Sequence, residues 1–219
     1  MVLRWNSSHD VAFLHTILIR HRLHEIVSVY QKLSPPNLSY DLSNRVCNVL
    51  GLLQALALHQ QTRYLFVKAQ IPLFLYPFLN TTIKQKPYEN LRVTSLGVIG
   101  ALVKGDDQKA ITFLRTTEII PLCLRIMRRG EDLSRTVATF IVQKMLSDKN
   151  GLEYICGTAE RFFAVISWMG GLMNFIGVCC FTEYGWRDIL IREYIDSWGL
   201  EIVDAYYKVL FETVGEYKS

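Results

Sequence analysis

The chain lacks the short motifs that mark the common classes of enzyme. Nowhere in its 219 residues is there a G-x-S-x-G nucleophile turn, a phosphate-binding G-x-x-x-x-G-K loop or a Cys/His set at metal-ligand spacing. The adjacent acids Asp106 and Asp107 follow Gly105 at the expected start of a helix, where carboxylates cap the helix and complement its dipole. We therefore predict a protein that is not an enzyme and that needs no metal or cofactor.

Cysteine and histidine are too few and too scattered to form a metal site. The five cysteines are an odd number, and Cys47, Cys123 and Cys156 stand among apolar residues at helical spacing. That setting predicts small core side chains in a reducing compartment. Of the five histidines, His21 and His24 are an i, i+3 pair, but no carboxylate or cysteine converges on them by spacing. Surface or helix-packing roles are expected for them.

Positive charge is in modest excess and is unevenly distributed. The net charge is +4, but the segment from Glu183 onward carries eight acids and four bases, so residues 1–182 hold a charge of +8. A basic body of this size suits acidic partners, RNA included, and is equally common in protein-binding helical repeats. Arg4, His9 and Asp10 interrupt the apolar residues at the N-terminus, so no signal peptide is expected, and the predicted compartment is the cytoplasm or the nucleus.

What the sequence does contain is an internal repeat. The triplet Ile71-Pro72-Leu73 returns 49 positions later as Ile120-Pro121-Leu122. A period in the forties, long enough for two or three helices, is typical of armadillo and HEAT repeats. The predicted fold class is therefore all-α, a right-handed solenoid of armadillo-like repeats. Such chains usually bind peptides or proteins along an extended face.

Three copies of the repeat can be followed along the chain. We expect the first copy to start a helix at Ser43, capped by Asp41 or by Ser43 itself, and the second copy to start one at Arg92. Pro72 and Pro121 are expected to open the third helix of the first two copies. The third copy follows around Arg135. One continuous core is predicted to contain Val46, Leu50, Leu53, Leu96, Ile99, Leu102, Val137, Phe140 and Ile141.

The two ends are less regular than the repeats. We expect residues 1–33 to form a divergent helical cap, residues 34–164 the repeat domain, and residues 165–219 a segment that is apolar at first and then helical. Phe162 to Thr182 is a run of 21 residues without a charge, long enough to cross a bilayer. Its three glycines, one asparagine and two cysteines favour a buried or altered solenoid end over a membrane span.

Several long blocks resemble one known family. SNRVCNVLGLLQALALH, IPLFLYPFLNTT, YENLRVTSLGVIGALVK, TTEIIPLCLRIM and LSRTVATFIVQKML are similar to the Rcd-type cell-differentiation family, the ninth, Caf-forty-type subunit of the Ccr–Not deadenylase complex. The resemblance covers residues 23–165, is most similar to plant members at SPPNL and TAERFF, and stops after about Ala164, as in a divergent or truncated paralogue. It implies a non-catalytic adaptor of mRNA deadenylation, decay and translational repression, located in the cytoplasm, in P-bodies and in the nucleus.

The resemblance also implies sites, residue by residue. Its regulator-peptide site corresponds to Val137 with the neighbouring Arg135, Thr136 and Phe140. Its tryptophan-binding region corresponds to Ala159, Arg161 and Tyr40, with alanine where the family motif has tyrosine. The helix that docks on the large Not scaffold subunit corresponds to Leu14, Thr16, Arg20 and Val27. Because Thr16 replaces an aromatic residue and Arg20 a small one, weakened binding to the scaffold is expected.

The densest basic cluster offers an alternative function. Arg125, Arg128 and Arg129 stand at the end of an expected third helix, which would line the binding groove of an armadillo stack. They either contact phosphates of RNA or another single-stranded nucleic acid, or simply form a solvated helix end that complements the dipole. A second copy of this chain is a further partner that the sequence leaves open.

Overall fold

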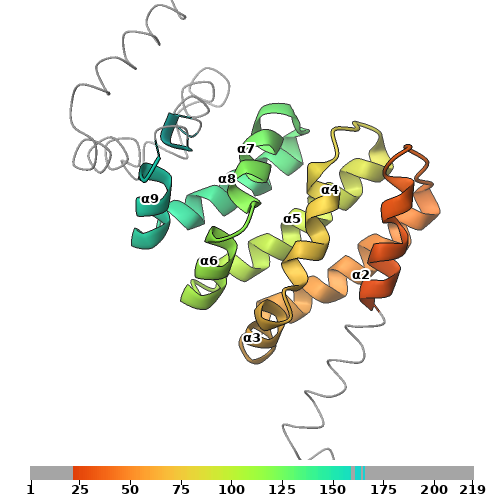
Figure 1. The fold of residues 1–219 in the computed structure, drawn as a ribbon. Coiled ribbons are helices and arrows are strands. Elements are labelled where there is room, and N and C mark those ends of the chain that lie inside the picture. Colours follow the sequence, from red (N-terminus) through yellow and green to blue (C-terminus); the bar gives the residue numbers. More distant parts are fainter. Residues whose placement is uncertain (1–21, 159–160, 164, 166–219) are drawn as a thin grey trace, which may run out of the picture. The chain divides into compact units, whose positions relative to one another are not determined.

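A computed structural model describes residues 22–158, 161–163 and 165 of the chain. The elements of this part are helices joined by short turns, and no β-strand occurs among the described residues (Figure 1). The chain divides into two compact units, residues 1–144 and 145–219, and each is described by itself. The all-α repeat architecture predicted from the sequence is confirmed. Most of the predicted N-terminal cap and nearly all of the segment 165–219 lie outside the described residues.

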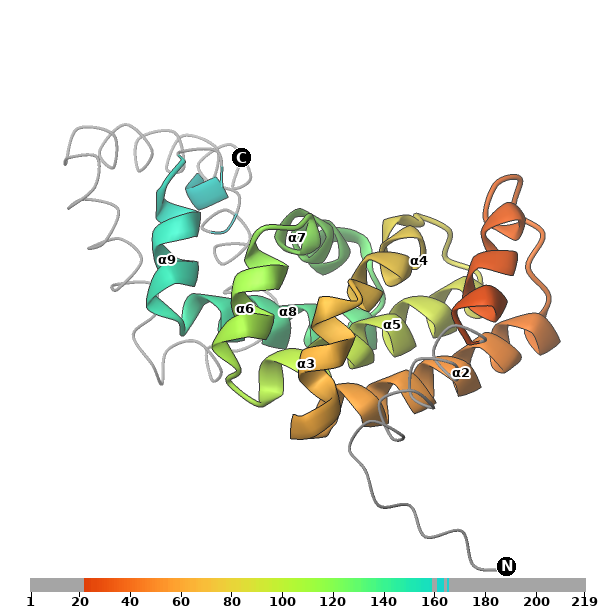
Figure 2. The same cartoon turned by 60° about the horizontal axis from the view of Figure 1, so that its bottom comes forward.

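Each copy of the repeat begins with a long helix. The first copy comprises α2 (Tyr40–Leu58), α3 (Gln60–Lys68), the 3-10 helix η2 (Ile71–Leu75) and α4 (Tyr76–Asn80). The second comprises α5 (Lys86–Lys104), α6 (Gln108–Arg115) and α7 (Ile119–Arg129), and the third α8 (Asp132–Leu146) and α9 (Lys149–Cys156). Residues 22–28 are helical and lead into the 3-10 helix η1 (Tyr30–Lys32). Within the first unit α2, α5 and α8 lie in one row, and α2 packs along α5 (Figures 1 and 2).

The long helices begin earlier than the sequence suggested. α2 starts at Tyr40 rather than at Ser43, because the hydroxyl of Ser39 accepts a hydrogen bond from the N–H of Leu42 at 3.3 Å and caps the helix. The expected cap at Asp41 or Ser43 is therefore wrong. Ser43 is buried inside the helix, where its hydroxyl donates to the carbonyl of Pro87 at 2.7 Å.

α5 likewise starts at Lys86, six residues before the predicted start at Arg92. Pro87 stands in its first turn, where a missing N–H leaves no intrahelical bond unmade. The buried Tyr88 hydroxyl then accepts from the N–H of Leu38 and donates to the carbonyl of Lys32, both at 3.1 Å. These two bonds fasten the turn after η1 to the first turn of α5.

The repeated Ile-Pro-Leu triplets do not give identical helices. In the second copy Pro121 lies in the first turn of the eleven-residue α7. In the first copy Pro72 lies in η2, and the α-helix starts only at Tyr76. The physical reason is Pro77, which would remove a hydrogen bond and clash with the preceding turn if one helix ran through it. Pro72 therefore opens a 3-10 helix, and the prediction that it opens the third α-helix is wrong.

The break between α5 and α6 forms as predicted. Asp107 caps α6 by accepting from the N–H groups of Lys109 at 2.9 Å and Ala110 at 3.4 Å. Gly105 is required by its neighbour, because a Cβ there would lie 2.1 Å from Nη1 of Arg63. That buried guanidinium donates to two carbonyls at the end of α2, Ala57 at 3.0 Å and Leu58 at 2.7 Å.

The hydrophobic core follows the sequence expectation with two exceptions. Seven predicted core residues are at most 1 % exposed: Val46, Leu50, Leu53, Leu96, Ile99, Leu102 and Ile141. Val137 and Phe140 are only half-buried, so their assignment to the core was wrong. The helix α8 turns Ala138, Ile141 and Val142 inward instead, which leaves Val137 and Phe140 on its flank.

The cysteines behave as apolar side chains where they are described. Cys123 and Cys156 are buried and Cys47 is half-buried, all three as free thiols. Burial raises the pKa of the Cys123 thiol far above its ordinary value, so it is an inert core group. Cys179 and Cys180 lie outside the described residues.

In the second unit Asp148 caps α9 by accepting from the N–H of Gly151 at 3.1 Å. No helix within the described part of the chain is long and apolar enough to cross a membrane. Most of the uncharged run 162–182 lies outside that part.

The burial of Leu96 generates a stability prediction. Leu96 is fully buried in α5, so Leu96→Ala should lower the free energy of unfolding by about 2–5 kcal/mol, since it removes apolar contacts and leaves a cavity. Urea denaturation followed by circular dichroism measures it. Leu52→Ala is the matched control, because Leu52 is 54 % exposed on α2 and its truncation should change little. Equal losses for the two variants would contradict the described core.

Candidate peptide-binding site

One face of the row of long helices carries small and half-buried residues in place of large buried ones. On each helix they follow the i, i+4, i+7 or i, i+3 spacing of a single helix side. We call this surface the glycine face and define it as Cys47, Gly51 and Gln54 on α2, Val93, Gly97 and Gly100 on α5, and Leu133, Val137 and Phe140 on α8.

Gly51 leaves room above the backbone of α2, whereas side chains of the neighbouring helices cover the two glycines of α5. A Cβ at Gly51 would have no heavy atom within 4 Å, so the space over α2 is open at this point. At Gly97 a Cβ would lie 3.3 Å from the Gln54 side chain, which bridges the two helices. At Gly100 it would make ordinary contacts with Val137 Cγ1 at 3.8 Å and the Phe140 ring at 3.9 Å. An added helix could therefore approach the backbone of α2 closely at Gly51.

The predicted peptide residues divide into two groups. The half-buried Val137 and Phe140 meet α5 on the glycine face. Thr136 is exposed and its hydroxyl donates to the carbonyl of Asp132 at 2.8 Å. Arg135 is half-buried and pairs with Asp132 at 3.5 Å. Val137 and Phe140 thus lie on the glycine face, while Arg135 and Thr136 make local bonds within α8. The peptide-binding role of all four residues stays a prediction.

An open recess of about 230 Å³ lies at one end of the glycine face. It contains two apolar rim residues, Val93 and the largely exposed Leu133, and several polar groups. We call it the polar recess and define it by its lining residues Asn44, Cys47, Lys86, Glu89, Asn90, Val93, Thr94, Glu131 and Leu133. The sequence analysis did not find this recess, because its residues come from α2, α5, the turn between α7 and α8, and the start of α8.

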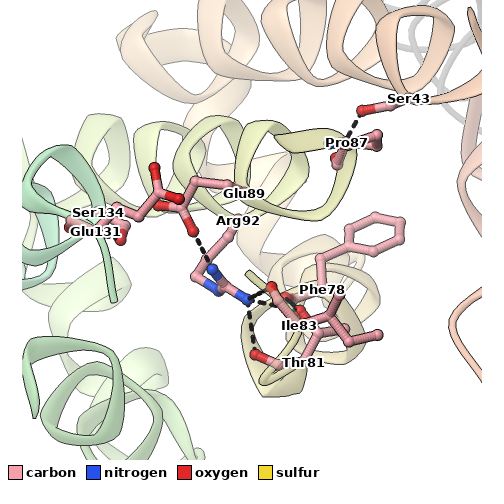
Figure 3. Close-up of polar contacts among 9 residues, drawn as sticks. All are labelled: Ser43, Phe78, Thr81, Ile83, Pro87, Glu89, Arg92, Glu131 and Ser134. Carbon is pink, nitrogen blue, oxygen red and sulfur yellow. Dashed lines mark hydrogen bonds and ion pairs between the residues drawn. The ribbon is translucent and has the colours of Figure 1, made fainter. Parts of the chain in front are cut away.

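Behind the recess a buried ion pair fixes the backbone. Arg92 and Glu89, 4 % and 3 % exposed, form an ion pair inside α5 (Figure 3). The guanidinium also donates to the carbonyl of Thr81 at 2.8 Å, to its hydroxyl at 3.1 Å and to the carbonyl of Ile83 at 3.0 Å. One arginine therefore holds the turn after α4 against the first half of α5. Arginine recurs at the corresponding positions of the other two copies, as Arg45 and Arg135, so the repeat marks this position in the sequence. Arg45, however, is exposed.

The predicted basic cluster lies apart from the glycine face. Arg125 and Arg129, with Lys84, line a second, small recess of about 20 Å³, which we call the basic recess, together with Arg92, Glu89 and Glu131. Arg128 is exposed and lines neither recess. These arginines belong to the third helix of their copy, whereas the glycine face is built from the first helix of each copy. The expectation that they line a binding groove stays a prediction. None of the three arginines makes an ion pair with a described residue.

Contacts between the shorter helices add rigidity. The Tyr76 hydroxyl of α4 hydrogen-bonds the Thr117 hydroxyl beside α7 at 2.5 Å, and burial raises the pKa of Tyr76 to about 12. The Tyr30 hydroxyl donates to the carbonyl of Phe74 at 2.5 Å, and burial raises its pKa to about 12 as well. Among the described residues no cluster of histidine, cysteine or carboxylate side chains could hold a metal ion.

Comparison with known proteins identifies the family. A sequence model described as the cell differentiation family, Rcd1-like, matches residues 8–181, a wider span than the resemblance over 23–165. The chain belongs to this family. It is 62 % identical over 151 residues to "Cell differentiation protein rcd1" of Schizosaccharomyces pombe, covering 69 % of this chain and 53 % of that protein. It is 58 % identical over 156 residues to "Protein CAF40" of Saccharomyces cerevisiae, covering 71 % of this chain and 42 % of that protein.

The chain thus spans about half the length of these two members of the Rcd1-like family. Of the expected scaffold-docking residues, Val27 is 41 % exposed on the helix 22–28, and its docking role stays a prediction. Leu14, Thr16 and Arg20 lie outside the described residues, so their docking role stays a prediction.

The expected tryptophan-binding residues fall in different units. In the second unit the Arg161 guanidinium lies 4.0 Å from the ring centroid of Tyr154 and donates to the Tyr154 carbonyl at 3.2 Å. Tyr40, in the first unit, is 57 % exposed. Ala159 lies outside the described residues. Tyr154 supplies an aromatic ring beside Arg161. The sequence analysis noted that the motif's tyrosine is missing but did not find this ring.

The buried ion pair generates the second prediction. Arg92→Met should lower the free energy of unfolding by about 3–5 kcal/mol, because it leaves the Glu89 carboxylate buried without its counterion. Chemical denaturation of the purified chain measures the loss. Arg128→Met removes an exposed arginine nearby and should leave stability almost unchanged. A stability of Arg92→Met equal to that of the wild type would show that the pair is not buried as described.

Proposed function

We propose that this chain is a non-catalytic adaptor subunit of the Ccr–Not deadenylase complex. In this proposal the chain docks on the large Not scaffold subunit and carries peptide-bearing regulators that bring the deadenylase to chosen mRNAs. It would act in the cytoplasm, including P-bodies, and in the nucleus. Membership of the Rcd1-like family supports the assignment to the complex.

The glycine face is the observation that carries the peptide-binding part. Val137 and Phe140 present apolar surface beside Gly100 on the flank of α5, and the space above Gly51 is open. An amphipathic helix binds a groove by laying i, i+3, i+4 and i+7 anchors on such a surface. Close approach of two helices favours small residues at their contact, so the glycines are suited to a helical partner.

The third prediction places this contact. Val137→Glu should abolish the binding of helical peptides, because it buries a charge in an apolar contact without a counterion. Gly51→Trp should do the same by filling the open space, and neither change should lower the melting temperature by more than a few degrees. The measurement is fluorescence anisotropy with peptides that a display library of amphipathic 20-residue sequences yields against the wild-type chain.

The control for both variants is Leu73→Glu, which places the same charge at an exposed apolar position outside the glycine face. It should leave peptide binding intact. If Val137→Glu unfolds the chain, Gly51→Trp still decides the matter, since a Cβ at position 51 has no heavy atom within 4 Å. Undiminished binding by Gly51→Trp would contradict the proposed site.

The fourth prediction concerns the scaffold. Titration with a Not scaffold fragment should show tighter binding for the double variant Thr16→Phe, Arg20→Ala than for the wild-type chain. An aromatic anchor is worth about 2 kcal/mol or more at an interface, and burial of an unpaired guanidinium is costly, so the gain could reach roughly a thousandfold. Equal affinities would mean that other residues, such as Val27, carry the contact.

The alternative function is binding of single-stranded nucleic acid by Arg125, Arg128 and Arg129. Their exposure and their lack of ion pairs with described residues favour it. Salt separates the two functions, because three phosphate contacts should make log K fall with log salt at a slope of about −2, whereas an apolar peptide contact should hardly change. The triple variant with glutamine at these positions should lose the salt-dependent part of the binding affinity and keep the rest.

A further inference from the structure

One oxygen at the bottom of the polar recess has no partner. Oε1 of Glu89 is buried, and no donor among the described residues hydrogen-bonds it. The other oxygen of the same carboxylate is taken by Arg92. A buried acceptor left without a hydrogen bond costs about 1–3 kcal/mol, so a donor brought by a bound molecule would stabilise the complex.

A second carboxylate lies next to the first. The Glu131 side chain, from the turn between α7 and α8, points toward Glu89 on α5 (Figure 3), and both residues line both recesses. Glu131 is exposed and makes no ion pair with a described residue. Two adjacent carboxylates repel each other, and a cation placed between them would remove that repulsion.

The remaining polar groups of the recess do not supply this cation. The Thr94 hydroxyl donates within the recess wall, to the carbonyl of Asn90 at 2.7 Å and to Sγ of Cys47 at 3.5 Å. Lys86 is the one cation besides the buried pair among the described lining residues, and it is exposed at the rim. Arg125, Arg129 and Lys84 line the basic recess and not the polar recess. The polar recess therefore presents more acceptors than donors.

We propose that the polar recess accepts a lysine or arginine side chain that projects from the apolar side of the docked peptide helix and pairs with Glu131 and Glu89. This inference rests on the proposed peptide-binding function and specifies the partner. Leu133, 62 % exposed at the rim, covers the aliphatic stem of the incoming side chain while its charged end reaches the carboxylates. The partner is thus an amphipathic helix with one basic residue inside its apolar stripe.

The volume of the recess agrees with such an occupant. About 230 Å³ is room for the end of a long side chain with accompanying water, whereas the basic recess, at about 20 Å³, holds a single water molecule. An acidic partner side chain would meet Glu131, which no described residue pairs, and Glu89, whose charge Arg92 already balances, and is therefore disfavoured there.

The test compares the wild-type chain with Glu131→Gln, which removes the charge and keeps the shape of an exposed side chain. A display library of random 20-residue peptides is selected on each full chain in parallel. The peptides selected on the wild-type chain should carry a lysine or arginine within the apolar stripe, and this preference should disappear on Glu131→Gln. Glu118→Gln is the matched control, an exposed acid at the N-terminus of α7 outside both recesses, and should select as the wild type does.

A double-mutant cycle on one selected peptide then measures the pair directly. Glu131→Gln and replacement of the basic peptide residue by glutamine should each weaken binding about tenfold, and both together should weaken it no more than either alone. The wild-type affinity should fall as salt rises, and that dependence should be smaller for Glu131→Gln.

Two results would overturn the inference. If the selected peptides lose binding on Val137→Glu but show no basic preference, or if the two changes in the cycle are additive, the cation pair is wrong while the proposed peptide function stands. If no selected peptide depends on Val137, both are wrong.

Discussion

The burial of α5 is the constraint on which the rest of the molecule depends. From Pro87 to Val103 most of its residues are buried, polar ones included, because it lies between α2, α8 and the short helices of its own and the preceding copy. A single copy could not cover α5, so the copies are stable only when stacked. The glycine face runs along the flank of α5 where Gly97 meets Gln54 of α2 and Gly100 meets Val137 and Phe140 of α8.

Because α5 is buried to this extent, its polar groups must find hydrogen-bond and ion-pair partners inside the protein. Arg92 and Glu89 pair with each other and bind the turn after α4, the Tyr88 hydroxyl binds backbone groups of residues 32–38, and the carbonyl of Pro87 accepts from Ser43. The exceptions are one oxygen of Glu89, which lines the recess beside the glycine face, and the buried hydroxyl of Ser95. The unpartnered oxygen of Glu89 distinguishes this end of the glycine face from a purely apolar contact.

The sequence predicted the architecture well because period and helix-breaking residues are local signals. The 49-residue return of Ile-Pro-Leu and the cap at Asp107 could both be recognised from the order of the residues alone. The start of α5 could not, since Lys86 and Pro87 continue the helix only because Ser43 and Tyr88 anchor its first turn. Val137 was placed both in the core and in the peptide site, because a one-position rotation of α8 decides whether a valine is core or surface, and the structure puts it on the flank. The recesses escaped prediction since their residues meet only after three copies have stacked.

The contact between Arg63 and Gly105 has a consequence for how this repeat array can change. The guanidinium of the first copy closes the end of α2 and fills the space where the second copy would otherwise carry a Cβ. The two copies are therefore not interchangeable, because the first supplies Arg63 and the second supplies Gly105 to the contact between them. A homologue with alanine or a larger residue at position 105 should have lost the arginine at position 63, and shuffling whole repeats between positions would break the junction even though every helix was kept.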